Sequence, residues 1–219
     1  MDERIETGSS ALRAQAALFE ALKAGRLRSG QFVSMPQLIE TLGFPMASVR
    51  EAVKHGCSVG LLETLPKRGL QVMDAGPEIT RHCMDLRAIL DQEGARRLIA
   101  SGRPLDLPAL RQTHVELRDA ARRSGGLELS SRAIETDLSL HNHLSTGLAN
   151  PLAEQEYEVN RIRIAIIQNT RPFLPNRIVS AMEEHLAIID ALEAGDAENA
   201  CVAIREHYRN TLIWWGIPV

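Results

Sequence analysis

The sequence is poor in aromatic residues and in cysteine, and it has no long apolar run. Only 4% of its 219 residues are aromatic, so leucine, isoleucine, valine and alanine must build the interior, a composition that favours helices. Its three cysteines, Cys57, Cys83 and Cys201, are odd in number and show no paired spacing, which indicates free thiols in a reducing compartment. No segment approaches the roughly 18 apolar residues that span a bilayer. Disulfide-framed and transmembrane proteins are therefore excluded.

The charge pattern is mild and does not by itself indicate a partner. Charged residues such as Asp2, Glu3 and Arg4 stand where a signal peptide would need an apolar segment, so we expect a cytoplasmic protein. The hydrophobic fraction is 44% and the charged fraction 24%, which is typical of a globular chain. The net charge is −3 at pH 7, and all three lysines lie in the first 67 residues.

The N-terminal third predicts short helices followed by a hairpin. The apolar spacing predicts a helix over residues 11–23 that ends at Gly25. Ser34 and Gln37 form a capping box that opens a second short helix, and Pro45 suits the first turn of a third. The runs LLETL and LQVM then flank the turn PKRG. This order is that of a winged helix-turn-helix, with a generic small α+β domain as the alternative.

The remainder of the chain predicts six helices and no strand. A linker is expected at residues 74–77. Breaks rich in glycine, proline or asparagine are expected near residues 102–104, 124–126, 149–151, 171–176 and 195–196. We therefore expect a mostly α protein, with a winged helix-turn-helix domain at residues 1–74 and an all-helical antiparallel bundle at residues 75–219.

Three of the predicted helices carry metal-ligand side chains on faces that point inward. Asp137 and His141 lie four residues apart and project to the same side of one helix. His185 and His207 each interrupt the apolar stripe of another helix. Core histidines bonded to backbone carbonyls are the alternative. Three histidines and one carboxylate on facing helices favour a divalent transition metal, Zn, Ni, Fe or Mn, because buried polar groups are costly unless paired.

The other histidines are interpreted as structural or surface residues. His143 lies about 200° around the helix from His141 at about 100° per residue, which points it away from the predicted ligands. His55, His82 and His114 have no partners in the sequence pattern.

Several longer runs carry a family resemblance over nearly the whole chain. They are ALKAGRLRSGQF, LIETLGF, SVREAV and PKRG in the first domain, and DLRAILDQEGARRLIA, DLSLH and EHLAIIDALEAGDAENA in the second. The glycine–aspartate turn between two histidines 22 residues apart is the most specific of these features. The chain resembles the FadR subfamily of GntR-family transcription regulators, with an FCD-type ligand-sensing domain. Its six-helix count is similar to that of the shorter, VanR-like branch.

The resemblance implies a homodimer that binds a near-palindromic double-stranded DNA operator. The positions that it assigns to DNA are Ser48, Arg50, Lys54, Lys67, Arg68 and Gly69. For Arg50, an ion pair with Glu51 or Glu40 is the alternative. Met46 stands where family members usually carry an arginine, and Pro36 stands near a position that is often basic. These departures predict weaker or differently specified DNA binding, with a shallower salt dependence.

The resemblance also implies a small carboxylate effector that completes the coordination of the metal. The candidate effector contacts are Arg87, Asn150 and Arg161. A salt bridge with Asp91 or Asp85 is the alternative for Arg87, and helix capping is the alternative for Asn150.

The sequence therefore predicts a ligand-responsive regulator, with repression as the commoner mode in the family, rather than an enzyme. A metal-dependent hydrolase is one alternative, although the sequence has no HExxH motif and marks no base beside the ligands. A sensor with weakened DNA binding is another. The apolar C-terminal residues 212–215 are expected to pack on the bundle or at a dimer interface.

Overall fold

The computed structural model describes residues 2–102, 105–123, 129–171 and 174–218, with only the backbone of residues 2–9. The chain packs as two compact units, one formed by residues 1–80 with 159–170 and the other by residues 81–158 with 171–219. A division by packing does not locate a DNA-binding domain, so the boundary expected after residue 74 stays a prediction. Within the described residues, none of the helices combines the length and the apolar character needed to cross a membrane.

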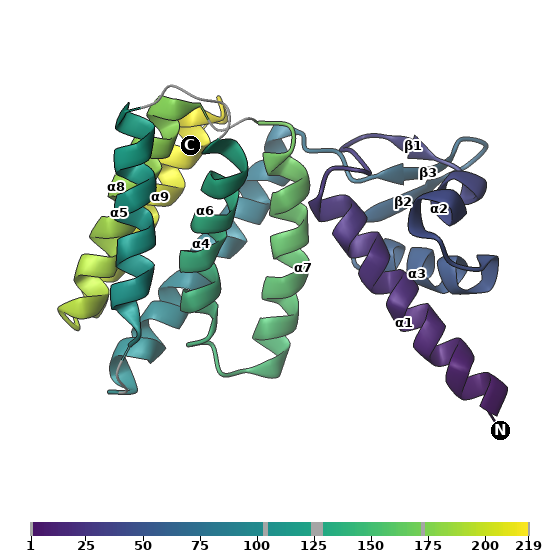
Figure 1. Cartoon of the computed structure of the whole chain (residues 1–219), viewed down its shortest axis with the longest axis horizontal. Helices are drawn as coiled ribbons and strands as arrows, with labels where there is room; N and C mark the ends of the chain where they lie inside the picture. Colours follow the sequence, from purple (N-terminus) through teal and green to yellow (C-terminus); the bar gives the residue numbers. More distant parts are fainter. Residues whose placement is uncertain (1, 103–104, 124–128, 172–173, 219) are drawn as a thin grey trace. The chain divides into compact units, whose positions relative to one another are not determined.

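The first unit contains three helices and a small antiparallel sheet. Its elements are α1 (Asp2–Lys23), β1 (Phe32–Val33), α2 (Met35–Leu42), α3 (Met46–Ser58), β2 (Leu62–Leu65) and β3 (Gly69–Val72) (Figure 1). The strand order is β1-β3-β2, and β2 and β3 form the expected hairpin. The winged helix-turn-helix prediction is confirmed. The sequence analysis missed β1, because its two residues are too few to show an alternating pattern.

Local signals in the sequence produce the expected ends of α2, whereas the starts of α1 and α3 differ from the prediction. Ser34 is the N-cap of α2, and it exchanges hydrogen bonds with Gln37 as a capping box. Gly43 ends α2 in the left-handed conformation, at φ 70°, which glycine adopts without steric cost. Pro45 precedes α3 as its N-cap residue instead of lying in the first turn. Helix α1 begins nine residues before the predicted start at residue 11.

The core of the first unit includes residues that lie far away in sequence. Leu18, Leu22 and Leu38 are fully buried in a cluster that also contains Ile162 and Ile166 of α7 (Pro151–Gln168). Arg163 of the same helix donates a hydrogen bond to the carbonyl of Val59, with an Nη2–O distance of 2.7 Å. The second half of α7 therefore completes the core of this unit.

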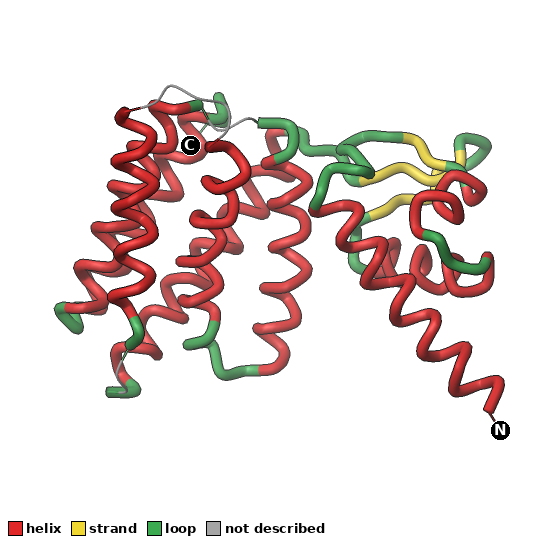
Figure 2. The backbone as a smooth tube through the Cα atoms, in the orientation of Figure 1, coloured by secondary structure: helices red, strands yellow, loops and turns green. Residues whose placement is uncertain are grey.

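The second unit is built from helices alone. Besides the first part of α7, its described helices are α4 (Pro77–Ala100), α5 (Leu107–Arg123), α6 (Ser130–Ser145), α8 (Pro175–Glu193) and α9 (Ala197–Trp214) (Figure 2). Helix α8 packs against α5, α6 and α9, and their apolar faces form the core. The prediction of six helices and no strand after residue 77 is confirmed for the part of the chain that the structure describes.

Helix α4 closely approaches the end of α6 and the turn after it at two glycines, Gly94 of α4 and Gly147 of the turn. A Cβ atom on Gly94 would overlap the carbonyl oxygen of Leu144, and one on Gly147 would overlap the carbonyl oxygen of Gly94. Only glycine permits this backbone separation. The close contact holds α4 against the helix that carries Asp137 and His141.

The apolar C-terminal segment continues α9 and is only partly buried. Leu212 is fully buried, whereas Ile213 and Trp214 are 58% and 46% exposed. The guanidinium of Arg177 lies 6.0 Å from the centre of the Trp214 ring. Leu212 therefore packs on the bundle, whereas Ile213 is exposed in the single chain, so the choice between the bundle and a dimer interface stays open for the rest of the segment.

Candidate metal centre

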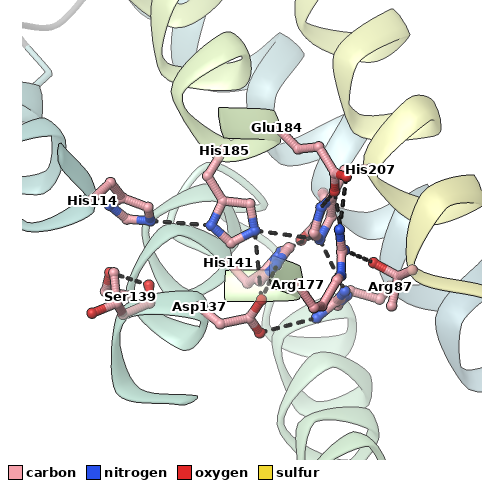
Figure 3. Close-up of polar contacts among 12 residues, drawn as sticks. Arg87, His114, Asp137, Ser139, His141, Arg177, Glu184, His185 and His207 are labelled. Atoms are coloured by element: carbon pink, nitrogen blue, oxygen red, sulfur yellow. Dashed lines mark hydrogen bonds and ion pairs between the residues drawn. The ribbon is translucent and has the colours of Figure 1, made fainter. Parts of the chain in front are cut away.

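Asp137, His141, His185 and His207 converge inside the second unit (Figure 3). Each offers one ligand atom, and these four atoms all lie within 4.8 Å of one another. All four residues are at most 3% exposed. Three helices supply them, α6 with two residues and α8 and α9 with one each. The structure thus brings together the four residues that the sequence proposed as ligands.

His141 is oriented by Asp91 of α4. Its Nδ1 donates to Asp91 Oδ2 at 2.7 Å, and both side chains are 2% exposed. A neutral imidazole that donates from Nδ1 carries its lone pair on Nε2. Nε2 of His141 has no hydrogen-bond partner among the described residues, although it is buried. This lone pair faces the other ligand atoms.

His207 is oriented by Glu184, which is itself held by Arg177. Nδ1 of His207 donates to Glu184 Oε2 at 2.7 Å, and Arg177 donates to both oxygens of Glu184 at 2.7 and 3.0 Å. Burial lowers the pKa of His207 to about 4, so its Nε2 carries a lone pair at neutral pH. Burial raises the pKa of Glu184, but the hydrogen bonds from His207 and Arg177 outweigh it, and the net pKa shift is downward.

His185 is oriented by a histidine instead of a carboxylate. Its Nδ1 lies 3.1 Å from Nε2 of His114 (Figure 3). Nδ1 of His114 lies 2.7 Å from the carbonyl oxygen of Leu110. Burial is the main cause that holds the pKa of His185 well below its usual value, and repulsion from the neighbouring histidines, were they protonated, and from Arg87 lowers it further. Burial also lowers the pKa of His114. Both imidazoles are therefore neutral at pH 7.

The chemistry of the donor set fits a cation at the centre of the cluster. Nε2 of His185 lies 3.3 Å from Nε2 of His207 and 3.5 Å from Asp137 Oδ1. His185 and His207 both carry their proton on Nδ1. The lone pairs on their Nε2 atoms and the carboxylate oxygen of Asp137 therefore face one another with no proton between them. Ligands about 2.0–2.1 Å from a zinc ion lie roughly 3.4 Å apart at tetrahedral angles, which matches these separations. A divalent ion would satisfy all of these atoms at once.

Arg87 of α4 borders the same cluster. Its Nη2 lies 3.4 Å from Nε2 of His207, and its Nη1 lies 3.6 Å from Asp137 Oδ2. The side chain is 6% exposed, and Nη1 has no hydrogen-bond partner within the described residues. The alternative for Arg87 was a salt bridge with Asp91 or Asp85. The ion pair that the structure shows is with Asp137 instead.

The structure does not bring the other two effector candidates to the cluster. Asn150 is exposed, and its Oδ1 accepts from the backbone N–H of Leu152 at 3.0 Å, which is the capping role weighed as the alternative. Arg161 is half-buried in the part of α7 that packs with the first unit, whereas the cluster lies in the second. The effector contacts of Asn150 and Arg161 stay predictions.

The predicted DNA contacts divide into exposed side chains and one buried one. Arg50 and Lys54 are exposed on α3, and Lys67 and Arg68 are exposed at the tip of the β2–β3 hairpin. Lys54 forms an ion pair with Glu51 at 2.7 Å. Gly69 is exposed at φ 90°, and Lys67 also has a positive φ, of 62°.

Ser48 is the buried one. It is 3% exposed, and its hydroxyl donates to the hydroxyl of Ser10 on α1 at 2.9 Å. In this position the side chain holds α3 against α1, and its contact with DNA stays a prediction. Met46, which stands where family members usually carry an arginine, is 49% exposed at the start of α3. This difference from the family therefore lies on the surface.

Sequence reasoning missed the residues that orient the ligands. His114 was interpreted as structural or surface, yet it is completely buried and contacts His185. Glu184 precedes a ligand in sequence but serves a different one, His207, on the next helix. Asp91 stood only as an alternative partner of Arg87. No spacing rule connects these residues to their histidines, because each contact joins two different helices.

Fold and site together define the class of protein: a winged helix-turn-helix chain whose helical unit carries a candidate metal centre. The model of the FCD domain family matches residues 82–210, more than half of the chain. The chain belongs to the FCD domain family, which confirms the resemblance found in the sequence. Among curated proteins, no match to the chain was found.

Two solved structures are similar to this chain over nearly its whole length. McbR/YncC of E. coli has a TM-score of 0.71 at 22% identity, over 94% of this chain and 97% of its own. A GntR protein from Rhodococcus sp. RHA1 has a TM-score of 0.73 at 19% identity, over 96% and 100% of the two chains. At these identities the likeness establishes the fold, in both parts of the chain.

Proposed function

We propose that this chain is a ligand-responsive, DNA-binding transcription regulator that senses a small carboxylate at a divalent metal in its FCD domain. The observation that carries the proposal is the buried cluster of Asp137, His141, His185 and His207, whose ligand atoms converge within 4.8 Å. A sensor domain of this kind joined to a winged helix-turn-helix unit supports control of DNA binding by a small molecule.

A carboxylate effector is supported by the charges around the cluster. The guanidinium of Arg87 is buried beside Asp137 and His207, with Nη1 lacking a hydrogen-bond partner in the described part of the chain. Guanidinium groups bind carboxylates through paired hydrogen bonds. A carboxylate that completes the coordination of a transition metal here would accept hydrogen bonds from Arg87, which would satisfy the buried donor.

DNA binding is supported by exposed basic residues on α3 and the wing. Arg50 and Lys54 project from the second helix of the helix-turn-helix, which in this motif enters the major groove. Lys67 and Arg68 occupy the hairpin tip, where a wing meets the backbone or the minor groove. The near-palindromic operator and the homodimer belong to the same proposal, since two-fold DNA sites mirror two-fold proteins.

Elemental analysis of the purified protein tests the sensing half. We expect about one transition-metal ion per chain, retained on dialysis and lost in the double variant Asp137→Ala/His185→Ala. A thermal-shift screen of small carboxylates on the loaded protein should then find a ligand whose effect disappears in Arg87→Ala. Wild-type protein that holds no metal even after reloading would overturn the metal centre.

DNA selection from a random duplex pool tests the DNA-binding half. We expect enrichment of near-palindromes with half-sites about one or two helical turns apart. The carboxylate found in the screen should change the affinity for the selected duplex, and by linkage the duplex should change the carboxylate affinity by the same factor. A duplex affinity that is independent of sequence and of effector would exclude a regulator of this kind.

A metal-dependent hydrolase is the second candidate from the sequence, and the geometry favours it less. Besides Asp137, two carboxylates contact the histidines, each at 2.7 Å: Asp91 accepts from Nδ1 of His141, and Glu184 accepts from Nδ1 of His207. Both oxygens of Glu184 are engaged, by His207 and Arg177. A general base must be able to take a proton from water or substrate. Glu184 is instead placed to orient His207.

A further inference from the structure

We propose that His114 is a positioning residue of the metal centre, which holds His185 in the tautomer and orientation that metal binding requires. This inference rests on the proposed metal centre and adds a residue outside the four ligands. It concerns a side chain on α5, a helix that supplies none of the four ligands.

The hydrogen bonds fix the proton positions one after another. The carbonyl oxygen of Leu110 can only accept, so Nδ1 of His114, 2.7 Å away, carries the proton. Nε2 of the neutral His114 then carries a lone pair and accepts from Nδ1 of His185 at 3.1 Å. The remaining nitrogen of His185, Nε2, is left with its lone pair directed at His207 and Asp137. A backbone carbonyl thus determines which nitrogen of His185 is available to a metal.

Burial makes this arrangement the dominant one. His114 and His185 are both 0% exposed, so no solvent water competes for their nitrogens. The two ring centres lie 5.2 Å apart with a 56° angle between the planes, which directs the edge of one ring at the edge of the other. The hydrogen bond at one ring nitrogen sets which nitrogen carries the proton, so without His114 nothing would hold the proton of His185 away from the atom that faces the metal.

The three histidines of the cluster therefore differ in the group that accepts a hydrogen bond from Nδ1. His141 and His207 donate to the carboxylates of Asp91 and Glu184, whereas His185 donates to a neutral imidazole. Carboxylate partners increase the basicity of a ligand histidine more than a neutral partner does. Because its partner is neutral, the orientation of His185 depends most on the position of the partner ring. Holding that position is the role that we assign to His114.

Two substitutions separate this positioning role from simple packing. His114→Phe keeps a ring in the cavity but removes the acceptor, and His114→Gln keeps an acceptor near the place of Nε2. We expect His114→Phe to weaken metal affinity by about 10- to 100-fold, measured by competition with a chromogenic chelator. His114→Gln should restore most of that affinity. His143→Gln changes a half-buried histidine of the same unit that contacts none of the four ligands in the hydrogen bonds described above; it is the control and should leave the affinity unchanged.

Long-range ¹H–¹⁵N NMR of the metal-free wild type reads the tautomers directly. We expect His185 with a protonated Nδ1 and an unprotonated Nε2, and the same tautomer for His114. A protonated Nε2 on metal-free His185 would overturn the inference, even if the variants fail to fold.

The outcomes distinguish this inference from the proposed function. A wild type that binds no metal overturns the metal centre and the role of His114 together. A wild type that binds metal, beside a folded His114→Phe variant with the same affinity, overturns the role of His114 alone. Weak binding by the Phe variant with recovery by the Gln variant supports both.

Discussion

At the scale of single residues, the centre depends on where protons lie as much as on which residues are present. Each of the three histidines uses Nδ1 for a hydrogen bond within the protein, which leaves Nε2 for the proposed metal. Regular spacing indicated the ligands, because Asp137 and His141 are one helical turn apart. The partners that set the tautomers could not be predicted this way, since Asp91 and His114 lie on other helices.

Replacement of Arg50 tests DNA recognition. Arg50 is exposed on α3, and a bidentate contact from an arginine to guanine contributes about 1–3 kcal/mol of discrimination. We expect Arg50→Ala to weaken binding to the selected duplex by roughly 5- to 150-fold, measured by fluorescence anisotropy. Arg122→Ala is the control: Arg122 is half exposed on α5 and pairs with Glu183, so its loss changes the charge equally. Equal effects of the two variants would argue against base recognition by Arg50.

The buried histidines predict an acid-sensitive metal-free protein. Burial lowers the pKa of His207 to about 4, whereas histidine in the unfolded chain titrates near about 6.5. Between these values the unfolded chain binds more protons, so the free energy of unfolding should fall as the pH falls through this window. The slope is about 1.4 kcal/mol per pH unit for each such histidine. Urea unfolding of chelator-treated protein at pH 7.5 and 5.0 measures it, and a stability that does not change would contradict the prediction.

At the scale of elements, the contact between α4 and α6 aligns the two sides of the centre. Helix α4 carries Arg87 and Asp91, and α6 carries Asp137 and His141. The contact at Gly94 and Gly147 sets the separation of the two helices. The glycines are visible in the sequence, but nothing in it shows that they face each other.

Gly94→Ala should disturb stability and metal binding together. The added Cβ overlaps the Leu144 carbonyl oxygen, so the helices must separate, at a cost of about 1–3 kcal/mol. We expect a lower melting temperature and weaker metal affinity, measured by calorimetry and chelator competition. Gly76→Ala is the control, because its Cβ would meet only Asp74, at 3.8 Å. Unchanged metal affinity in Gly94→Ala would show that this separation does not position the ligands.

Helix α7 supplies core residues to the winged-helix unit, which its position in the sequence did not suggest. Ile166 is 1% exposed and belongs to the same apolar cluster as Leu18 and Leu22. We expect Ile166→Ala to destabilise this unit by about 2–5 kcal/mol, seen as lower hydrogen-exchange protection in α1. Leu152→Ala on the same helix is the control, since Leu152 is 75% exposed. Protection of α1 that is unaffected by Ile166→Ala would contradict the assignment of α7 to this core.

At the scale of the whole molecule, the division into two packing units means that each unit has its own stability. The cluster lies entirely in the second unit, so a metal should stabilise that unit first. Metal at about 100 times its Kd should contribute about 2.7 kcal/mol. We expect calorimetry with and without chelator to move the transition of the second unit, and Asp137→Ala/His185→Ala to abolish the shift. A shift that persists in the double variant would place the metal elsewhere.

The amino-acid sequence by itself determined the classes of structure in this protein. Capping residues, apolar spacing and turn residues are local signals, and they correctly predicted the winged-helix order, the helices of the bundle and the residues of the cluster. Inward-facing polar residues were visible because they interrupt apolar stripes, as His185 and His207 do.

The tertiary structure alone decided which groups meet. It paired His114 with His185 and Glu184 with His207, buried Ser48 against α1, and gave half of α7 to the first unit. The physical reason is that these contacts join helices far apart in sequence, at positions set by the packing of whole faces. Spacing along one helix specifies a direction, and only packing specifies the partner that lies in that direction.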